Sequence, residues 1–366
     1  MIVRSTPAWQ QALTQAISDP LELLELLQLS PAALGVPEDA AAARRQFPLR
    51  VPRGFAARMR PGDPADPLLR QVLPVDREAQ PAPGFSTDPL AESESHPTPG
   101  LLHKYRGRAL LVVTGACAVH CRYCFRRHFP YAESSGRGTW DQALEHLAAD
   151  SSLVEVILSG GDPLSVSDGQ LAELVQRLTA IPHLRRLRIH SRLPVVLPER
   201  IDHQLLEWLA GSRLRPVLVI HANHPREIDD AVVEALERLR RAGVTLLNQA
   251  VLLRGVNDDV AVLEELSEVL FAAGVLPYYL HLLDRVDGAA HFEVPEPEAR
   301  RLAAGLTRRL PGYLVPRLVR EVAGAEAKVP VDLQRELRGR ETMISAPGAT
   351  RARPADEKHR RPRFDV

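Results

Sequence analysis

The middle of this 366-residue chain alternates short apolar runs with longer amphipathic stretches, and this alternation restricts the fold more than any other feature. Short continuous apolar runs are typical of strands that are buried in a parallel sheet. The runs that we expect to form strands are ALLVVTG (109–115), VEVILSG (154–160), LRRLRIHS (184–191), RPVLVIHA (215–222), TLLNQAVLL (245–253), PYYLHLL (277–283) and YLVPRLVREV (313–322). Strands that alternate with helices predict right-handed βαβ units and a parallel α/β sheet.

Two of the intervening stretches show a helical period especially clearly. Residues 168–178 (DGQLAELVQRL) place their apolar side chains on one face, and Ser167 with Gln170 is expected to form a capping box. Residues 227–243 have the same pattern, and Gly243 is expected to end the helix. Six such units predict a barrel-like sheet, either the closed eight-stranded form or an open, partial one. Either form would place the chemistry on the loops that follow the strands.

The chain divides into three expected parts. Residues 1–100 begin with a helical pattern and then become Pro-rich, as in RPGDPADP, which predicts an extension that wraps the main domain as loops. Residues 101–333 contain the barrel. Residues 334–366 are basic and contain proline, which favours a solvated, mobile tail over a segment that contacts RNA.

The composition excludes several classes of protein. Lys plus Arg and Asp plus Glu both number 46, so no net charge favours a nucleic acid or a membrane surface as partner. The start of the chain lacks the apolar region of a secretory signal, and no run of apolar residues is long enough to span a bilayer. All three cysteines lie close together, so they do not form a disulfide framework, and we expect a reducing cytoplasm.

The cysteines Cys117, Cys121 and Cys124 have the spacing C-x3-C-x2-C directly after the first expected barrel strand. A structural zinc site needs four ligands, and His120 or His128 could supply the fourth. An iron–sulfur cubane that is held by three thiolates instead leaves one iron with an open coordination position, which is useful only if another molecule binds there. The remaining interpretation is that the three cysteines are buried and have no function.

The stretch CAVHCRYC (117–124) resembles the CxxxCxxC motif of radical S-adenosylmethionine (SAM) enzymes, with an aromatic residue before the last cysteine. A second stretch, LSGGDPL (158–164), resembles the Gly-Gly-Asp/Glu element that contacts the SAM amino group in these enzymes. The resemblance implies a 4Fe-4S cluster, a SAM cofactor and the partial (β/α)6 TIM-like barrel of that superfamily. It also implies that SAM is contacted by Tyr123, Ser159, Gly160, Gly161 and Asp162.

Further motifs, in the same order along the chain, resemble the lysine 2,3-aminomutase family. They are CRYCFRRHF (121–129), HSRLPVVLPERI (190–201), ANHPREI (222–228), NQAVLLRGVND (248–258) and PYYLHLLDRVDGAAHF (277–292). This resemblance implies an isomerase in which the SAM-derived radical takes a hydrogen from C3 of lysine and pyridoxal 5′-phosphate (PLP) assists the amino group in moving from C2 to C3. Lys328, in EVAGAEAKVP, stands at the position of the lysine that binds PLP, although small residues replace a run of glycines there.

The same resemblance assigns the other site residues. Arg126 matches the arginine that binds the substrate carboxylate, for which a guanidinium is well shaped. Asp284 and Glu321 match the two acids around the far ammonium of lysine, with glutamate in place of aspartate at 321. The segment HKYRGR matches the one that holds the PLP phosphate, through Lys104, Tyr105 and Arg108. At the expected strand ends, we predict that SAM or PLP is contacted by Arg192, His221 and Gln249.

The chain departs from the catabolic members of the family. Those members carry extra cysteines for a structural zinc and a longer C-terminal region, whereas Asp259 stands at one of these cysteine positions, so we expect no zinc. Short, zinc-free members resemble the bacterial proteins that supply (R)-β-lysine, made from (S)-α-lysine, for β-lysylation of elongation factor P (EF-P). This implies a functional link to EF-P and its lysine ligase, and a flavodoxin- or ferredoxin-like electron donor.

Three alternatives stay open at this point. The first is a lysine aminomutase that serves catabolism or osmolyte production. The second is an iron–sulfur or zinc regulatory protein without catalysis, which would not explain the SGGD stretch or Lys328. The third is a radical SAM enzyme that does not use PLP.

Overall fold

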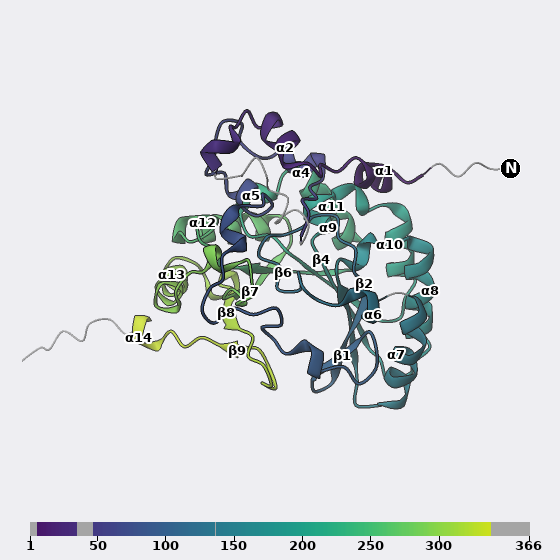
Figure 1. Cartoon of the computed structure of the whole chain (residues 1–366). Helices are drawn as coiled ribbons and strands as arrows, with labels where there is room; N and C mark the ends of the chain where they lie inside the picture. The colour runs from purple at the N-terminus through teal and green to yellow at the C-terminus, as the bar shows by residue number, and fades with distance from the viewer. Residues whose placement is uncertain (1–5, 35–46, 136, 338–366) are drawn as a thin grey trace, which may run out of the picture.

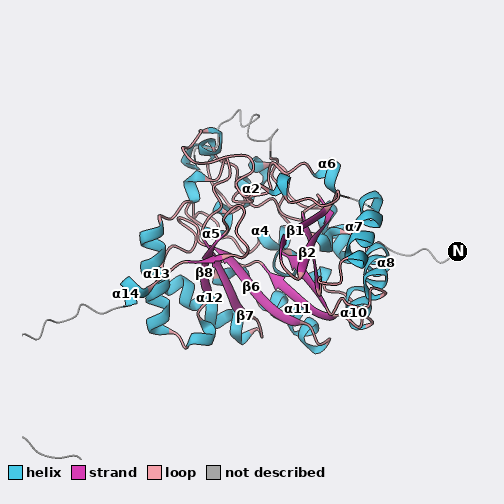
Figure 2. Cartoon of the chain, turned by 90° about the horizontal axis from the view of Figure 1, so that it is seen from below, coloured by secondary structure: helices cyan, strands magenta, loops and turns pink. Residues whose placement is uncertain are grey.

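The computed structural model describes residues 6–34, 47–135 and 137–337. In these residues nine strands form one curved sheet in which each strand pairs with its neighbour in sequence (Figures 1 and 2). The strands are β1 (Leu101–Tyr105), β2 (Arg108–Thr114), β3 (Glu155–Gly160), β4 (Arg186–Ser191), β5 (Arg215–Ile220), β6 (Thr245–Val251), β7 (Leu276–His281), β8 (Arg317–Arg320) and β9 (Val329–Pro330). Strands β2 to β8 are parallel, and no pairing joins β1 to β9 within the described residues. The sheet is therefore the open, partial barrel, and the closed form is excluded.

Within the described part of the chain, six main helices connect the successive parallel strands and lie outside the sheet (Figure 2). They are α7 (Arg137–Ala149), α8 (Asp168–Thr179), α10 (His203–Ala210), α11 (Asp230–Arg241), α12 (Val260–Ala272) and α13 (Glu296–Arg309). The predicted helices correspond to α8 and α11, and Gly243 lies just beyond α11 with φ of 79°. The prediction of a capping box was wrong, because the Ser167 hydroxyl donates to the Gln170 side chain (2.9 Å) and Ser167 caps no backbone amide.

The two edge strands were not predicted from the sequence. β1 pairs antiparallel with β2 through a tight turn at Arg106 and Gly107, where Gly107 has φ of 76°. β9 adds two residues on the other edge, antiparallel to β8. Both strands are short, and β1 carries polar side chains that break the apolar pattern.

The helices of residues 6–34 and 47–73 lie across one end of the barrel (Figure 1). The α-helices among them are α1 (Ala8–Thr14), α2 (Pro20–Leu26), α4 (Arg53–Ala56) and α5 (Pro67–Arg70). The apolar face that was expected around α2 is buried. The proposed division at residues 100 and 333 stays a prediction, and the basic tail lies, from residue 338, outside the described residues. Among the described helices, none is long and apolar enough to cross a membrane.

The N-terminal residues hold the loop that carries the cysteines. The fully buried Arg122 donates to Glu78 through Nε (2.7 Å) and Nη2 (2.5 Å), and to the Phe47 carbonyl through Nη1 (2.7 Å). The Arg122 amide donates to the Gln71 carbonyl (2.8 Å), and the ring of His120 contacts the Pro48 carbonyl at 2.8 Å. Residues 47–80 therefore fix the shape of the cysteine loop from outside the barrel.

This buried ion pair predicts a large stability difference between two arginine variants. Arg122→Met removes two charged hydrogen bonds from the buried Glu78, so the free energy of unfolding is expected to fall by about 3 kcal/mol. Arg177→Met breaks an exposed pair with Asp141 (2.7 Å) and is expected to lose less than about 1 kcal/mol. Urea unfolding of both variants at neutral pH measures the difference, and equal losses would contradict this account of the clamp.

Candidate active site

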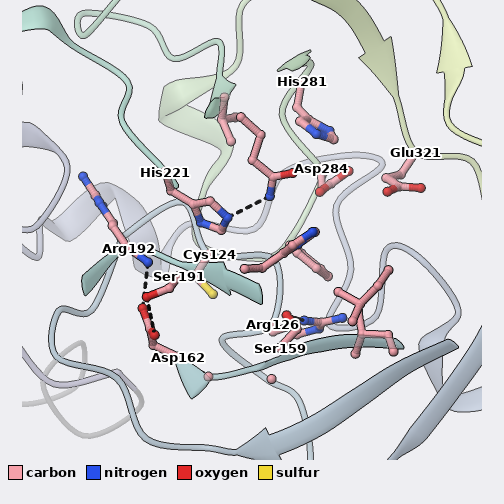
Figure 3. A pocket seen from close by; sticks show the side chains of 18 of the residues that line it. Cys124, Arg126, Ser159, Asp162, Ser191, Arg192, His221, His281, Asp284 and Glu321 are labelled. Carbon is pink, nitrogen blue, oxygen red and sulfur yellow. Dashed lines mark hydrogen bonds between the residues drawn. The ribbon is translucent and has the colours of Figure 1, made fainter. Parts of the chain in front are cut away.

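The carboxyl ends of the parallel strands surround a cavity of about 410 Å³. All of the side chains and glycines that the sequence predicted for the site line this one cavity, although they come from distant segments. Figure 3 shows Asp284, Glu321 and His281 on one side, and Cys124, Asp162 and Arg192 on the other. The fold thus brings the predicted residues together, while the role of each residue stays a prediction.

The three cysteines are free and partly buried at the end of β2. Among the described residues, one set of three possible metal ligands has its ligand atoms within 4.8 Å of one another: His103, His146 and Asp150, which lie outside this cavity. The three cysteines do not form such a set. A single zinc ion with Zn–S bonds of about 2.3 Å would bring its sulfurs to about 4 Å from one another. The three cysteine sulfurs do not all meet this criterion, and a 4Fe-4S cluster on the three thiolates stays a prediction.

The environment of the cysteine loop suits ligands that are charged only when a metal is bound. Burial raises the pKa of the Cys124 thiol to about 11 and that of Cys117 well above its usual range. Arg192 donates from Nη1 to the Cys121 sulfur at 2.7 Å and also binds Glu227 and Gln71. The positive charge of Arg192 would partly balance the negative charge of a thiolate cluster.

Gly160 and Gly161 form a surface that a side chain would fill. A Cβ at Gly161 would lie 2.5 Å from the Ala116 carbonyl oxygen, and Gly160 has φ of 118° with the Thr114 oxygen 2.6 Å from such a Cβ. Gly160 therefore lies against β2, and Gly161 lies against the residues just before Cys117, with no room for a side chain at either position. Both glycines pack against protein backbone, and their contact with SAM stays a prediction.

The carboxylate of Asp162 is already fully engaged. Its Oδ1 accepts from the Leu164 amide (3.1 Å) and the Ser191 hydroxyl (2.7 Å), and its Oδ2 accepts from the amides of Arg192 (2.7 Å) and Leu193 (3.2 Å). Burial raises the pKa of Asp162 to about 6, although these hydrogen bonds act in the opposite direction. In this structure Asp162 links the end of β3 to the end of β4, which the sequence did not predict.

Arg126 lies on the cavity floor in a buried ion pair that was missed from the sequence. Its Nε and Nη2 donate to the two carboxylate oxygens of Glu92 at 2.8 and 2.9 Å, and its Nη1 donates to the Ser159 hydroxyl at 3.1 Å. Lys104 donates to the same Glu92 at 3.3 Å. Glu92 lies in the Pro-rich segment before β1, where no periodic pattern marked it.

Lys328 and Glu321 face each other on the far side of the cavity. The Lys328 ammonium donates to one carboxylate oxygen of Glu321, and the Tyr105 hydroxyl donates to the other. Burial raises the pKa of Glu321, but Lys328 and Tyr105 outweigh burial and the net direction is downward. Lys328 and Glu321 therefore neutralise each other in the ligand-free protein.

Asp284 has no such partner: none of the described residues forms a hydrogen bond or an ion pair with its side chain. Burial raises the pKa of Asp284 to about 7, and Glu321 adds to this effect while Lys328 opposes it. A buried carboxylate with no cation beside it is costly, and a ligand ammonium would relieve that cost. Asp284 is therefore ready to bind a cation.

Three histidines from neighbouring strands line the same cavity. His221 contacts Gln249 at 2.8 Å, and burial lowers its pKa to about 3, so the ring is neutral. Burial also lowers the pKa of His190 and His281 well below the usual range. The Nε2 atoms of His190 and His281 are buried and have no hydrogen-bond partner, which is the state expected of groups that contact a bound molecule. The sequence analysis missed both, although their positions at strand ends could have revealed them.

A cationic corner lies beside β1 and β2. The Arg108 guanidinium stacks over the Tyr105 ring at 4.6 Å. Arg188 also lines the cavity, and burial lowers its pKa, with Arg108 adding to this effect. Together with Lys104, these cations fit an anion as large as a phosphate group. Arg188 was missed because it lies within a strand, where a basic residue is expected to face solvent.

The chain is similar in sequence to known proteins. The sequence profile of the Radical SAM superfamily matches residues 111–266. The chain is 53% identical to an L-lysine 2,3-aminomutase of Escherichia coli over 91% of this chain and 98% of that protein. It is 50% identical to one of Haemophilus influenzae, over 89% and 96% of the two chains. A longer L-lysine 2,3-aminomutase of Clostridium subterminale is 37% identical, over 84% of this chain and 74% of its own.

The unpaired Asp284 predicts a stability change that depends on pH. Its folded pKa of about 7 lies above the usual value of 3.8, so ionisation of Asp284 opposes folding increasingly as the pH rises between these values. Asp284→Asn is therefore expected to gain stability relative to the parent between pH 5 and pH 7.5, with a constant difference above that range. Glu92, Lys104, Glu321 and Lys328 also act on this carboxyl group and are unchanged in the variant.

Thermal unfolding of the metal-free, ligand-free protein at several pH values measures this difference. Asp141→Asn, at an exposed carboxylate in the pair with Arg177, is the control and should show no such trend. A stability difference between Asp284→Asn and the parent that stays the same at pH 5 and pH 8 would contradict the proposed burial of an unpaired charge.

Proposed function

The chain belongs to the L-lysine 2,3-aminomutase family of the radical SAM superfamily and is an isomerase, and from this premise we propose that it converts (S)-α-lysine to (R)-β-lysine with PLP, for β-lysylation of EF-P. The family implies a 4Fe-4S cluster and SAM as cofactors. The observation that carries the proposal is that one cavity contains the three cysteines, a half-buried lysine and an unpaired carboxylate. We place this chemistry in the cytoplasm, where the thiols stay reduced.

The cysteine side of the cavity has the groups that a cluster and SAM require. When bound to Cys117, Cys121 and Cys124, the cluster would supply an open iron and the electron that splits SAM. Gly160 and Gly161 let the end of β3 pack closely against β2 and the residues before Cys117, and Arg192 is fixed by Asp162 and Glu227 next to Cys121. These residues would hold and orient the cofactors, and the cofactors would carry out the reactive step.

The opposite side of the cavity has the groups that PLP requires. PLP attached to Lys328 would supply a conjugated π-system through which an amino group moves between adjacent carbons. Arg108, Lys104 and Arg188 provide positive charge for its phosphate, and the unpartnered histidine nitrogens provide polar contacts. Glu321 holds the Lys328 ammonium while no cofactor is attached.

Charge complementarity supports lysine as the substrate. Arg126 provides a guanidinium for the α-carboxylate, and Asp284 provides an unpaired carboxylate for the far ammonium. An amino acid without a terminal ammonium would leave Asp284 buried and unpaired, which selects against it. Glu321 would add a second negative charge near the ammonium.

The EF-P pathway is supported by the cysteine content and by Asp259, which stands where longer members carry a zinc-binding cysteine. The chain spans nearly all of the Escherichia coli relative but 74% of the Clostridium subterminale one. It has no cysteine beyond Cys124, so it lacks thiols for the structural zinc of longer members. We therefore propose that β-lysine passes to the ligase that modifies EF-P, and that a flavodoxin- or ferredoxin-like protein supplies electrons.

The assignment of Lys328 is tested by reduction with borohydride. The chain has three lysines, Lys104, Lys328 and Lys358, so a pyridoxyl group can be mapped without ambiguity. We expect peptide mass spectrometry to find the group on Lys328, and Lys328→Ala to abolish both the adduct and the mutase activity. Lys358→Ala serves as the control. A folded Lys328→Ala protein with full activity would exclude the assignment.

The function itself is tested by anaerobic assay of the reconstituted protein with lysine, SAM, PLP and a reductant. Chiral analysis is expected to show (R)-β-lysine, with no product when either SAM or PLP is omitted. Product without PLP would favour the alternative enzyme class. Rescue of EF-P modification in cells that lack their own aminomutase separates the EF-P role from a catabolic one.

A further inference from the structure

Glu92 lies between two cations that the proposed function uses for different anions. It is 5% exposed and belongs to the short helix η3 (Glu92–Glu94), which enters the cavity from the N-terminal segment. Its Oε2 accepts from Arg126 Nε, and its Oε1 accepts from both Arg126 Nη2 (2.9 Å) and Lys104 Nζ (3.3 Å). One carboxylate therefore fixes both the guanidinium and the ammonium.

The backbone is held in place to present this carboxylate. Ala91, just before Glu92, has φ of 47°, a left-handed conformation that a residue with a side chain rarely adopts. The Glu92 amide donates to the Asp88 side chain at 3.0 Å, which closes the turn. The surrounding residues thus stabilise a strained turn, and this turn places the Glu92 side chain in the cavity.

The contacts of Arg126 leave it one way to bind a further anion. A guanidinium has five N–H donors. Glu92 takes one from Nε and one from Nη2, and Ser159 takes one from Nη1, which leaves one N–H on each terminal nitrogen. The rings of Phe125 and Phe129 lie 4.8 and 6.0 Å from the guanidinium carbon. Arg126 can therefore still bind a substrate carboxylate, but only along its free edge.

Glu92 is ionised at neutral pH. Burial raises its pKa, but Arg126 and Lys104 outweigh burial and lower it to about 2. Without this negative charge, two cations would lie close together in the cavity, and either could attract either anion.

We propose that Glu92 is a positioning residue that keeps Arg126 for the substrate carboxylate and Lys104 for the phosphate of PLP, and so sets the preference for substrates with an α-carboxylate. This inference rests on the proposed function. Glu92 acts through Arg126 and Lys104 and does not itself contact the substrate.

The test compares Glu92→Gln, Glu92→Asp and the parent by calorimetric binding of lysine and of lysinamide to the anaerobic holoenzyme. Lysinamide keeps both amino groups but lacks the carboxylate. Glu92→Gln is expected to weaken lysine binding about 10- to 100-fold, the range for a hydrogen bond to a charged group, and to leave lysinamide binding within about threefold. KM for lysine should rise by a similar factor, with a smaller change in kcat. Glu92→Asp keeps the charge and should recover part of the preference for lysine.

The control is Glu237→Gln, which breaks an exposed ion pair with Arg240 on α11 and should change the binding of neither lysine nor lysinamide. Equal losses for lysine and lysinamide, or unchanged lysine binding, would overturn the inference and leave the proposed function intact. Tighter lysine binding by Glu92→Gln would also overturn it, because Glu92 would then compete with the substrate. If Glu92→Gln does not fold, Glu92→Asp decides the question through the ratio of its dissociation constants for lysine and lysinamide. No lysine binding by the parent would instead overturn the proposed function, and this inference with it.

Discussion

The loop that carries Cys117, Cys121 and Cys124 after β2 is held on both sides, and the rest of the site depends on this constraint. A cluster with an open iron needs three thiolates on a loop that cannot collapse. The barrel supplies one wall, through Gly160 and Gly161. The N-terminal segment supplies the other, through Glu78 and its buried ion pair with Arg122.

The cavity next to this loop keeps its charges separate. Arg126 and Lys104 both bind Glu92, Lys328 binds Glu321, and the side chain of Asp284 forms no hydrogen bond or ion pair with the described residues. Between them lie histidines that burial keeps neutral, so they can contact a ligand without adding charge. In such a dry site each unpaired charge strongly favours a ligand of the opposite sign. A molecule with a carboxylate at one end and an ammonium at the other matches this pattern, and lysine is such a molecule.

Much of the fold could be predicted because buried parallel strands and amphipathic helices leave a periodic trace. The seven apolar runs became β2 to β8, whereas β1 was missed because polar side chains interrupt it, and β9 because it has only two residues. The cysteine motif and the SGGD stretch identified one end of the site, and a family resemblance identified Lys328 and Asp284. Glu92 could not be found in this way, because its role comes from a turn that only the packed chain defines. Asp162 shows the reverse case: its residue type suggested a ligand contact, and the fold uses all of its lone pairs for internal hydrogen bonds.

The open iron position is tested most directly by electron paramagnetic resonance of the anaerobically reduced protein before and after SAM is added. The account predicts the spectrum of a reduced 4Fe-4S cluster that shifts on addition of SAM, as a new ligand binds the iron that no cysteine holds. A cluster whose spectrum SAM leaves unchanged, or a protein that contains zinc and no iron, would contradict it.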